Sequence, residues 1–320
     1  MAEVLDVDLL AFERGSEAER RGVVDGVLRS LGTGFVFTSH DIPGELLDTA
    51  YALLAEFFTL PTDEKQRWHA PRSHGQTGYT GLLVETAAAA DVADWKEMLN
   101  WGAEIPAHHP LRTHYPHRYA DQVLPDDAAV AGLAKALREL HDRVVDLQTR
   151  FLRIVAVGLG AHESYFDDVL VDGSTLTRAI HYPPMAEAPT EGHVWADAHK
   201  DINLITALPR ASGPGLQLQT DDGWVDVIPP EGHVVVNSGM MLERLSNGRI
   251  PAGVHRVVAP AAAGGDRYSV VQFCHPAPWF QLGPIPSCVD ADHPLRYGTI
   301  EAGALLDRVL YEIGLIAPEG

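Results

Sequence analysis

HKDINLITAL at residues 199–208 is the stretch that decides the fold of this chain, because it sets a histidine and a carboxylate two residues apart at the start of a strand-like run. Side chains two residues apart point to the same face of a strand, so His199 and Asp201 can bind one metal ion together. GVHRVVAP at residues 253–260 supplies a third candidate ligand, His255, on another predicted strand. Two imidazoles and one carboxylate on one face of an octahedral ion leave three positions open, which is the arrangement of non-haem iron oxygenases.

A His-x-acid triplet is a weak signal when it stands alone. With 16 histidines and 44 acidic residues among 320, chance alone produces such triplets. A histidine that lies near an unrelated acid is therefore the competing interpretation of His199, and the surrounding sequence has to decide between the two.

RYS at residues 267–269 opens a further strand-like run and places Arg267 and Ser269 on one face by the same two-residue period. A guanidinium holds a carboxylate through two parallel hydrogen bonds, and a neighbouring hydroxyl adds a third. Tyr182, in the segment HYPP, is a further candidate donor. These residues suit the far carboxylate of a five-carbon diacid, while an ion pair between Arg267 and a structural acid is the alternative.

The region around these candidates is rich in predicted strands. From Thr175 to His275, short runs of β-branched residues alternate with Gly, Pro and Asp turns, which is typical of an antiparallel sandwich or barrel. The run DDG at residues 221–223 predicts a hairpin turn. Residues 126–159 carry apolar side chains every three or four positions and predict one long helix beneath the sheet.

Helices are also predicted on either side of this region. Ser16 and Glu19 form a capping-box pattern that opens a helix, and residues 43–58 predict a second one. Residues 71–116 predict loops with short elements, and residues 301–313 predict a closing helix.

Composition limits the classes of protein that the chain can form. Hydrophobic residues make up 46% and charged residues 21%, as in a folded domain and unlike a disordered chain. The net charge of −20 argues against nucleic acid or an anionic membrane as a partner. Two cysteines cannot build a disulfide framework or a thiolate zinc cluster, and no signal peptide or long apolar segment is evident, so we expect a cytoplasmic protein.

Taken in order, these segments resemble the isopenicillin N synthase-like branch of the iron(II)/2-oxoglutarate dioxygenases. The likeness covers nearly the whole chain, and it begins with GFVFTSHDIPGELLDTAYALLAEFFTLPTDEKQRW, GYTGLLVETA, DWKEMLNWG and TRAIHYPP. It continues through AHKDINLITAL, GLQLQTDDGWVDVIPPEGHVVVNSGMMLERLSNG, GVHRVVAP and RYSVVQFCHP.

The resemblance implies a mainly β fold with α-helices. Its core would be a double-stranded β-helix (a distorted jelly roll) with flanking helices, including one long backbone helix. Residues 1–120 would form an N-terminal α/β segment of this fold. Residues 121–320 would add the long helix, the catalytic core and the C-terminal helix, all within one compact unit.

The resemblance also implies a dioxygenase that uses Fe(II), 2-oxoglutarate and O₂. The implied iron ligands are His199, Asp201 and His255, and the implied 2-oxoglutarate-binding residues are Arg267, Ser269 and Tyr182. The enzyme would oxidise an unactivated C–H bond of a small molecule, which we expect to be a secondary metabolite, and release succinate and CO₂. Hydroxylation is the expected outcome, with desaturation and ring closure as further ones. Because Asp201 supplies a carboxylate, halogenation is not expected.

The substrate would lie on the open side of the iron. Seven side chains are candidates for its pocket, and core packing is the competing role of the aromatic ones: Phe37, Tyr79, Trp95, Trp195, Phe273, His275 and Phe280. Three positions depart from the family pattern, with Asp41 in place of a turn glycine, Ile180 in place of an asparagine and Met240 in place of an aspartate. These departures argue against a direct transfer of plant substrate specificity.

Two other functions stay open at this level. An iron oxidase like isopenicillin N synthase or 1-aminocyclopropane-1-carboxylate oxidase would share the fold without consuming 2-oxoglutarate. A non-catalytic sugar- or hormone-binding jelly roll would keep the histidines for structural reasons. In each case we expect a monomer or a weak oligomer.

Overall fold

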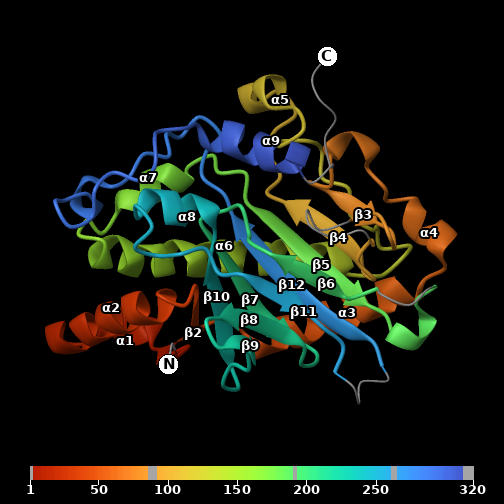
Figure 1. Cartoon of the computed structure of the whole chain (residues 1–320). Coiled ribbons are helices and arrows are strands. Elements are labelled where there is room, and N and C mark those ends of the chain that lie inside the picture. Colours follow the sequence, from red (N-terminus) through yellow and green to blue (C-terminus); the bar gives the residue numbers. More distant parts are fainter. Residues whose placement is uncertain (1–2, 86–91, 190–192, 261–264, 313–320) are drawn as a thin grey trace.

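The computed structural model of the chain describes residues 3–85, 92–189, 193–260 and 265–312 (Figure 1). Its strands are β1 (Asp6–Val7), β2 (Phe35–Ser39), β3 (Gly78–Thr80), β4 (Glu97–Gly102), β5 (Leu176–Tyr182), β6 (Ala196–His199), β7 (Ile205–Ala211), β8 (Leu216–Thr220), β9 (Gly223–Asp226), β10 (His233–Ser238), β11 (His255–Val257) and β12 (Arg267–Cys274).

Helices flank these strands. The α-helices are α1 (Leu9–Arg14), α2 (Glu17–Leu31), α3 (Gly44–Thr59), α4 (Thr62–Gln66), α5 (Pro110–His114), α6 (Leu133–Gly158), α7 (Tyr165–Leu170), α8 (Met240–Leu245) and α9 (Ala302–Glu312). The short 3-10 helices in the described part of the chain are η1 (Pro71–Ser73), η2 (Met185–Glu187) and η3 (Pro286–Cys288). None of the described helices is long and apolar enough to cross a bilayer.

The strands form two sheets. The larger has the order β1-β2-β10-β7-β12-β5-β4-β3, and the smaller has the order β6-β11-β8-β9. From β5 to β12 the chain crosses repeatedly from one sheet to the other. The larger sheet contains β5, β7, β10 and β12, and the smaller contains β6, β8, β9 and β11. The pairs that these eight strands form with one another are antiparallel. This arrangement confirms the predicted double-stranded β-helix.

The N-terminal part of the chain extends the larger sheet at both edges. β1 and β2 continue it beyond β10, while β4 and β3 continue it beyond β5. Residues 1–120 and residues 121–320 thus both contribute strands to one sheet. The boundary between these two regions stays a prediction. β4 lies inside the segment for which mainly loops were predicted. Five of its six residues are buried, so the strand lacks the alternation that would have revealed it.

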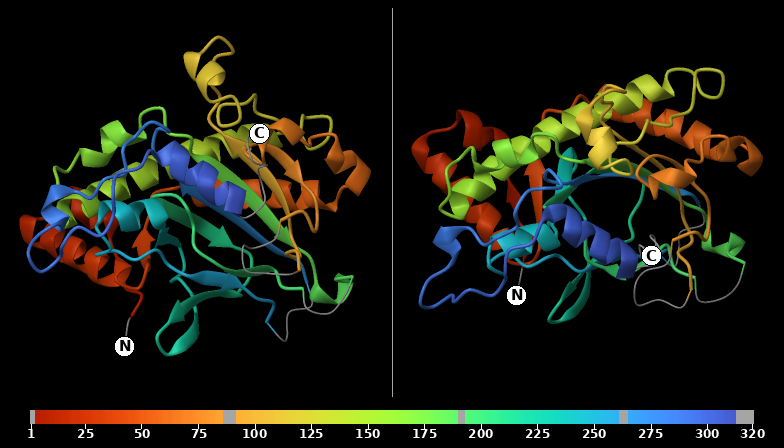
Figure 2. Two further views of the ribbon diagram at one scale, coloured as in Figure 1. Left: turned by 45° about the horizontal axis from the view of Figure 1, so that its top comes forward. Right: turned by 90° about the horizontal axis from the view of Figure 1, so that it is seen from above.

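The long helix is confirmed as α6, which lies along one face of the larger sheet (Figure 2). Its buried stripe includes Leu137, Val144 and Phe151, and it contacts β7 and β12. The helix begins seven residues later than predicted, because Gly132 directly before it adopts a positive φ of 80° that ends the preceding turn.

Other local predictions agree with the structure. Ser16 and Glu19 make both bonds of the capping box at the start of α2, α3 spans the second predicted helix, and residues 221–222 form the turn between β8 and β9. The closing helix is α9, and its predicted last residue, 313, lies outside the described residues.

Candidate metal centre

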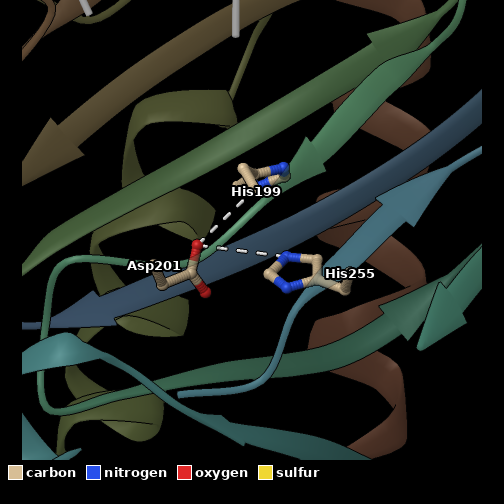
Figure 3. Close-up of side chains that lie close together, drawn as sticks. All are labelled: His199, Asp201 and His255. Carbon is tan, nitrogen blue, oxygen red and sulfur yellow. Dashed lines mark ion pairs between the residues drawn. The ribbon is translucent and has the colours of Figure 1, made fainter. Parts of the chain in front are cut away.

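Three side chains converge between the two sheets (Figure 3). Asp201 Oδ1 lies 3.8 Å from His199 Nε2 and 3.9 Å from His255 Nε2. The candidate ligand atoms of the three residues all lie within 4.8 Å of one another, so a single ion between them could contact all three. The structure therefore brings together the residues predicted as metal ligands, which are called the metal triad below.

The route by which the triad assembles differs from the prediction. His199 and Asp201 were expected on one face of a strand, but β6 ends at His199 and Asp201 lies in the turn before β7. The Asp201 carbonyl accepts a bond from Met240 N (2.8 Å), which ties this turn to the start of α8. His255 reaches the site because β11 pairs with β6 so that His255 lies opposite His199.

Backbone carbonyls orient both imidazoles. His199 Nδ1 donates to the Asp197 carbonyl (2.7 Å) and His255 Nδ1 donates to the Gly253 carbonyl (3.1 Å), so each Nε2 is left to face Asp201. Burial, assisted by the charge of His255, lowers the pKa of His199 to about 4. The neutral imidazole that results is the form that binds a metal.

Among the described residues, the hydrogen bonds to the Asp201 carboxylate reach one of its two oxygens. Oδ2 accepts from Thr206 Oγ1 (2.5 Å) and Asn237 Nδ2 (2.8 Å), and Asn203 Nδ2 donates to Thr206 Oγ1 (2.9 Å). Burial alone would raise the pKa of Asp201, but the two triad histidines and these hydrogen bonds lower it. Asp201 is therefore an anion whose Oδ1 is directed at the histidines.

A carboxylate-binding group lies in the same cavity. Arg267 faces Tyr182 across the β12–β5 pairing, with its guanidinium carbon 5.0 Å from the centre of the tyrosine ring, and Ser269 lies two residues further along β12. Arg267 is 4% exposed, and its Nε donates to the carbonyls of residues 213 and 214. Its Nη1 has no hydrogen-bond partner among the described residues. No structural acid neutralises this arginine there, and a buried orphaned donor fits a ligand carboxylate.

One cavity joins the metal triad to Arg267, Ser269 and Tyr182, which are called the carboxylate anchor below. Of the seven candidate substrate residues, Phe273 lines this cavity. The other six are not among the residues that line it, and the structure gives them these surroundings: Phe37 packs with Leu218 and Val235, Tyr79 donates to Glu97, Trp95 and Trp195 donate to the carbonyls of Pro184 and Pro183, His275 is buried directly after β12, and Phe280 packs against the main core.

Four polar residues of the site were not predicted. Thr206 and Asn237 bind Asp201, while Lys96 and Arg178 line the cavity near the triad. Arg178 could have been found, because it lies four residues before Tyr182 and the two-residue period of β5 puts both on one face. Thr206 and Lys96 carry no such signal, since their roles depend on contacts across the sheets.

The chain is similar in sequence to known proteins. The model of the 2OG-Fe(II) oxygenase superfamily matches residues 173–276, and a model described as the N-terminal region of non-haem dioxygenases in morphine synthesis matches residues 4–126. The chain is 30% identical over 273 residues to a 2-oxoglutarate-Fe(II) type oxidoreductase of Emericella nidulans, covering 83% of this chain and 77% of the relative. It is 27% identical over 302 residues to the mugineic-acid 3-dioxygenase of Hordeum vulgare, covering 93% and 82%.

Solved structures give the same result. A crystal structure of a 2OG-Fe(II) oxygenase family protein from Caulobacter crescentus is 32% identical, with a TM-score of 0.84 and coverage of 98% of this chain and 100% of the other. A Neurospora crassa protein crystallised with alpha-KG and thymine is 26% identical, with a TM-score of 0.83 and coverage of 96% of each chain.

Proposed function

The chain belongs to the 2OG-Fe(II) oxygenase superfamily, and we propose that the metal triad holds its ferrous ion and the carboxylate anchor holds 2-oxoglutarate. The protein is an Fe(II)- and 2-oxoglutarate-dependent dioxygenase that acts on a small molecule. Relatives named for 2-oxoglutarate support this function over the alternative of an oxidase that dispenses with the diacid. The observation that carries the residue assignment is the partnerless, buried Nη1 of Arg267 in the cavity that the triad lines.

The chemistry of the reaction is supplied by the bound groups, and the protein positions them. With iron bound, O₂ converts 2-oxoglutarate to succinate and CO₂ and provides one oxygen atom for a C–H bond of the substrate. The chain's own residues present the Nε2 atoms of two imidazoles and one carboxylate oxygen to the metal, and a guanidinium to the far end of the diacid. We propose hydroxylation of a secondary metabolite as the reaction.

Two variants test the assignment separately. Asp201→Ala should abolish tight Fe(II) binding, because it removes the only anionic ligand of the triad. Arg267→Leu should leave Fe(II) binding intact and weaken 2-oxoglutarate binding by about 100-fold or more, since each lost charge-assisted hydrogen bond contributes about 1.5–3 kcal/mol. Anaerobic calorimetric titration of Fe(II), and then of 2-oxoglutarate, measures both affinities.

Arg14→Leu is the matched control, because Arg14 is exposed in the last turn of α1. Succinate formation is then followed after O₂ is admitted to these samples. If Arg267→Leu binds 2-oxoglutarate as tightly as the parent, the carboxylate anchor is wrongly assigned. If substrate oxidation proceeds without consuming 2-oxoglutarate, the oxidase alternative returns.

The remaining expectations concern partners, oligomeric state and location. From the net charge of −20 we infer that nucleic acid and anionic membranes are not partners, and we expect a monomer or weak oligomer in the cytoplasm. Light scattering on a sizing column measures the oligomeric state directly.

A further inference from the structure

Four charged side chains form a cluster beside the metal triad, called the charged quartet below. Lys96 Nζ lies 2.8 Å from Asp94 Oδ2 and 3.3 Å from Glu85 Oε2, and Arg178 Nη1 lies 3.3 Å from Glu85 Oε1. The four side chains are only 5–15% exposed. The two cations and two anions leave the quartet without net charge.

Lys96 and Glu85 keep their charges despite their burial. Burial alone would lower the pKa of Lys96, but the carboxylates of Glu85 and Asp94 raise it. Burial alone would likewise raise the pKa of Glu85, but Arg178 and Lys96 lower it. The quartet is therefore a set of balanced charges.

Arg178 lies at the metal end of the cavity. In the pairing of β5 with β12, Tyr182 lies opposite Arg267, and Arg178 lies opposite Val271. Arg178 and Tyr182 are four positions apart on the strand, or about 13 Å between Cα atoms. The Arg178 guanidinium carbon lies 5.4 Å from the centre of the Phe273 ring.

Phe273 lies at the same position along the larger sheet as the metal triad. It lies opposite Thr206 in the pairing of β12 with β7, and Thr206 donates to Asp201. The carboxylate anchor is thus at one end of the cavity, and the triad, Phe273 and Arg178 are at the other.

The quartet offers hydrogen-bond donors to the cavity. Lys96 and Arg178 line the cavity, whereas Glu85 and Asp94 are not among its lining residues. The ammonium group of Lys96 has three donors, and its two carboxylate partners use two of them. Arg178 donates from Nε to Asn100 Oδ1 (2.7 Å) and from Nη1 to Glu85, and no bond within the described ranges uses its Nη2.

We propose that the charged quartet selects a neutral substrate whose carbonyl oxygen, from an amide, lactam or ketone, accepts hydrogen bonds from Lys96 and Arg178. A carboxylate would accept the same bonds, but it would add an uncompensated negative charge to a cluster that is already balanced and shielded from water. Phe273 supplies an apolar surface in the same cavity, next to Arg178. This inference rests on the proposed function, because it names the substrate class of the same site.

Three probes of similar size test how the charge of a ligand affects its binding. Cyclohexanecarboxamide is a neutral acceptor, cyclohexanecarboxylate is an anion, and cyclohexylmethylammonium is a cation. Each is titrated calorimetrically, without oxygen, into the protein loaded with Fe(II) and 2-oxoglutarate. The carboxamide should bind at least about 10-fold more tightly than either charged probe, a preference of about 1.4 kcal/mol.

Glu85→Gln gives a sharper test, because it keeps the side-chain shape while giving the quartet a net positive charge. The preference should then reverse in favour of the carboxylate, whereas Glu139→Gln, at an exposed position on α6, should leave the order of affinities unchanged. Lys96→Met should weaken carboxamide binding at least about 10-fold, against Lys135→Met as the exposed control. Circular dichroism verifies the fold of each variant.

Any of three results overturns the inference: equal or tighter carboxylate binding by the parent protein, an unchanged preference in Glu85→Gln, or no binding of the carboxamide. Iron and 2-oxoglutarate affinities are measured in the same samples first. If the protein binds Fe(II) and 2-oxoglutarate but shows no preference among the probes, this inference alone is overturned. If it binds neither Fe(II) nor 2-oxoglutarate, the proposed function is overturned.

Discussion

At the residue scale, the site depends on a carboxylate whose two oxygens have different roles. Asp201 Oδ2 is occupied by Thr206 and Asn237, so Oδ1 is the oxygen that faces the triad histidines. Without these bonds the carboxylate could rotate about its terminal torsion, which has broad wells. Hydrogen bonds behind a ligand commonly determine its orientation and the affinity of the metal site.

Thr206→Val should therefore weaken Fe(II) binding by about 10–100-fold, because valine keeps the shape of the side chain and removes one bond to Asp201. Competition with a chromophoric chelator under anaerobic conditions measures the affinity. The control is Thr113→Val, at an exposed position in α5. An affinity equal to that of the parent protein would show that Thr206 does not orient the ligand.

At the element scale, the start of β2 packs closely against the segment that leads into β11. Gly34, with a φ of 85°, is so close to Gly253 that a Cβ on Gly34 would lie 2.4 Å from Gly253 Cα. A Cβ on Gly253 would in turn lie 2.6 Å from Phe35 Cε2. The Phe35 ring packs edge-on against the His255 imidazole, with 5.6 Å between ring centres. Two glycines thus let β2 support a triad histidine.

Gly253→Ala should lower the free energy of unfolding by about 1–3 kcal/mol, because the new methyl group overpacks a well-filled region. The displaced Phe35 should also disturb His255 and weaken Fe(II) binding. Chemical denaturation and the chelator assay measure the two effects. Gly44→Ala in the first turn of α3 is the control, since a Cβ there meets no atom within 4 Å. Unchanged stability of Gly253→Ala would refute this account of the packing.

At the scale of the whole molecule, buried histidines make stability depend on pH. Burial lowers the pKa of His141 and of His275 to about 4, from an ordinary value near 6.5. His141 is 3% exposed, and its ring bonds Thr177 Oγ1 at 2.6 Å. Between pH 6.5 and pH 4 these histidines bind protons in the unfolded chain but not in the folded chain. The folded state therefore loses stability as the pH falls through this range.

The free energy of unfolding should accordingly decrease between pH 6.5 and pH 4, with each such histidine contributing up to about 1.4 kcal/mol per pH unit. Urea denaturation at several pH values between 7.5 and 4.5 measures the slope. His141→Gln should make the slope shallower, and His108→Gln, at an exposed position, should not. An equal slope in the His141 variant and the parent would rule out the contribution of His141.

Much of this architecture could be predicted from local pattern. The two-residue period of the strands placed Arg267 and Ser269 on one face, and both line the cavity. The apolar stripe of residues 126–159 predicted the long helix, although its start depends on the backbone of Gly132. β4 was missed because a strand buried on both faces shows no alternation.

By itself, the sequence determined which residue types could form the metal triad and the carboxylate anchor, since spacing and strand period are local properties of the chain. Only the tertiary structure decided that Asp201 reaches its partners from a turn. It also decided that Phe273 lines the cavity while the other candidate substrate residues do not. Finally, it decided that Lys96 and Arg178 both form ion pairs with Glu85. The physical reason is that these arrangements depend on strand register and on packing between sheets, which join residues far apart in the chain.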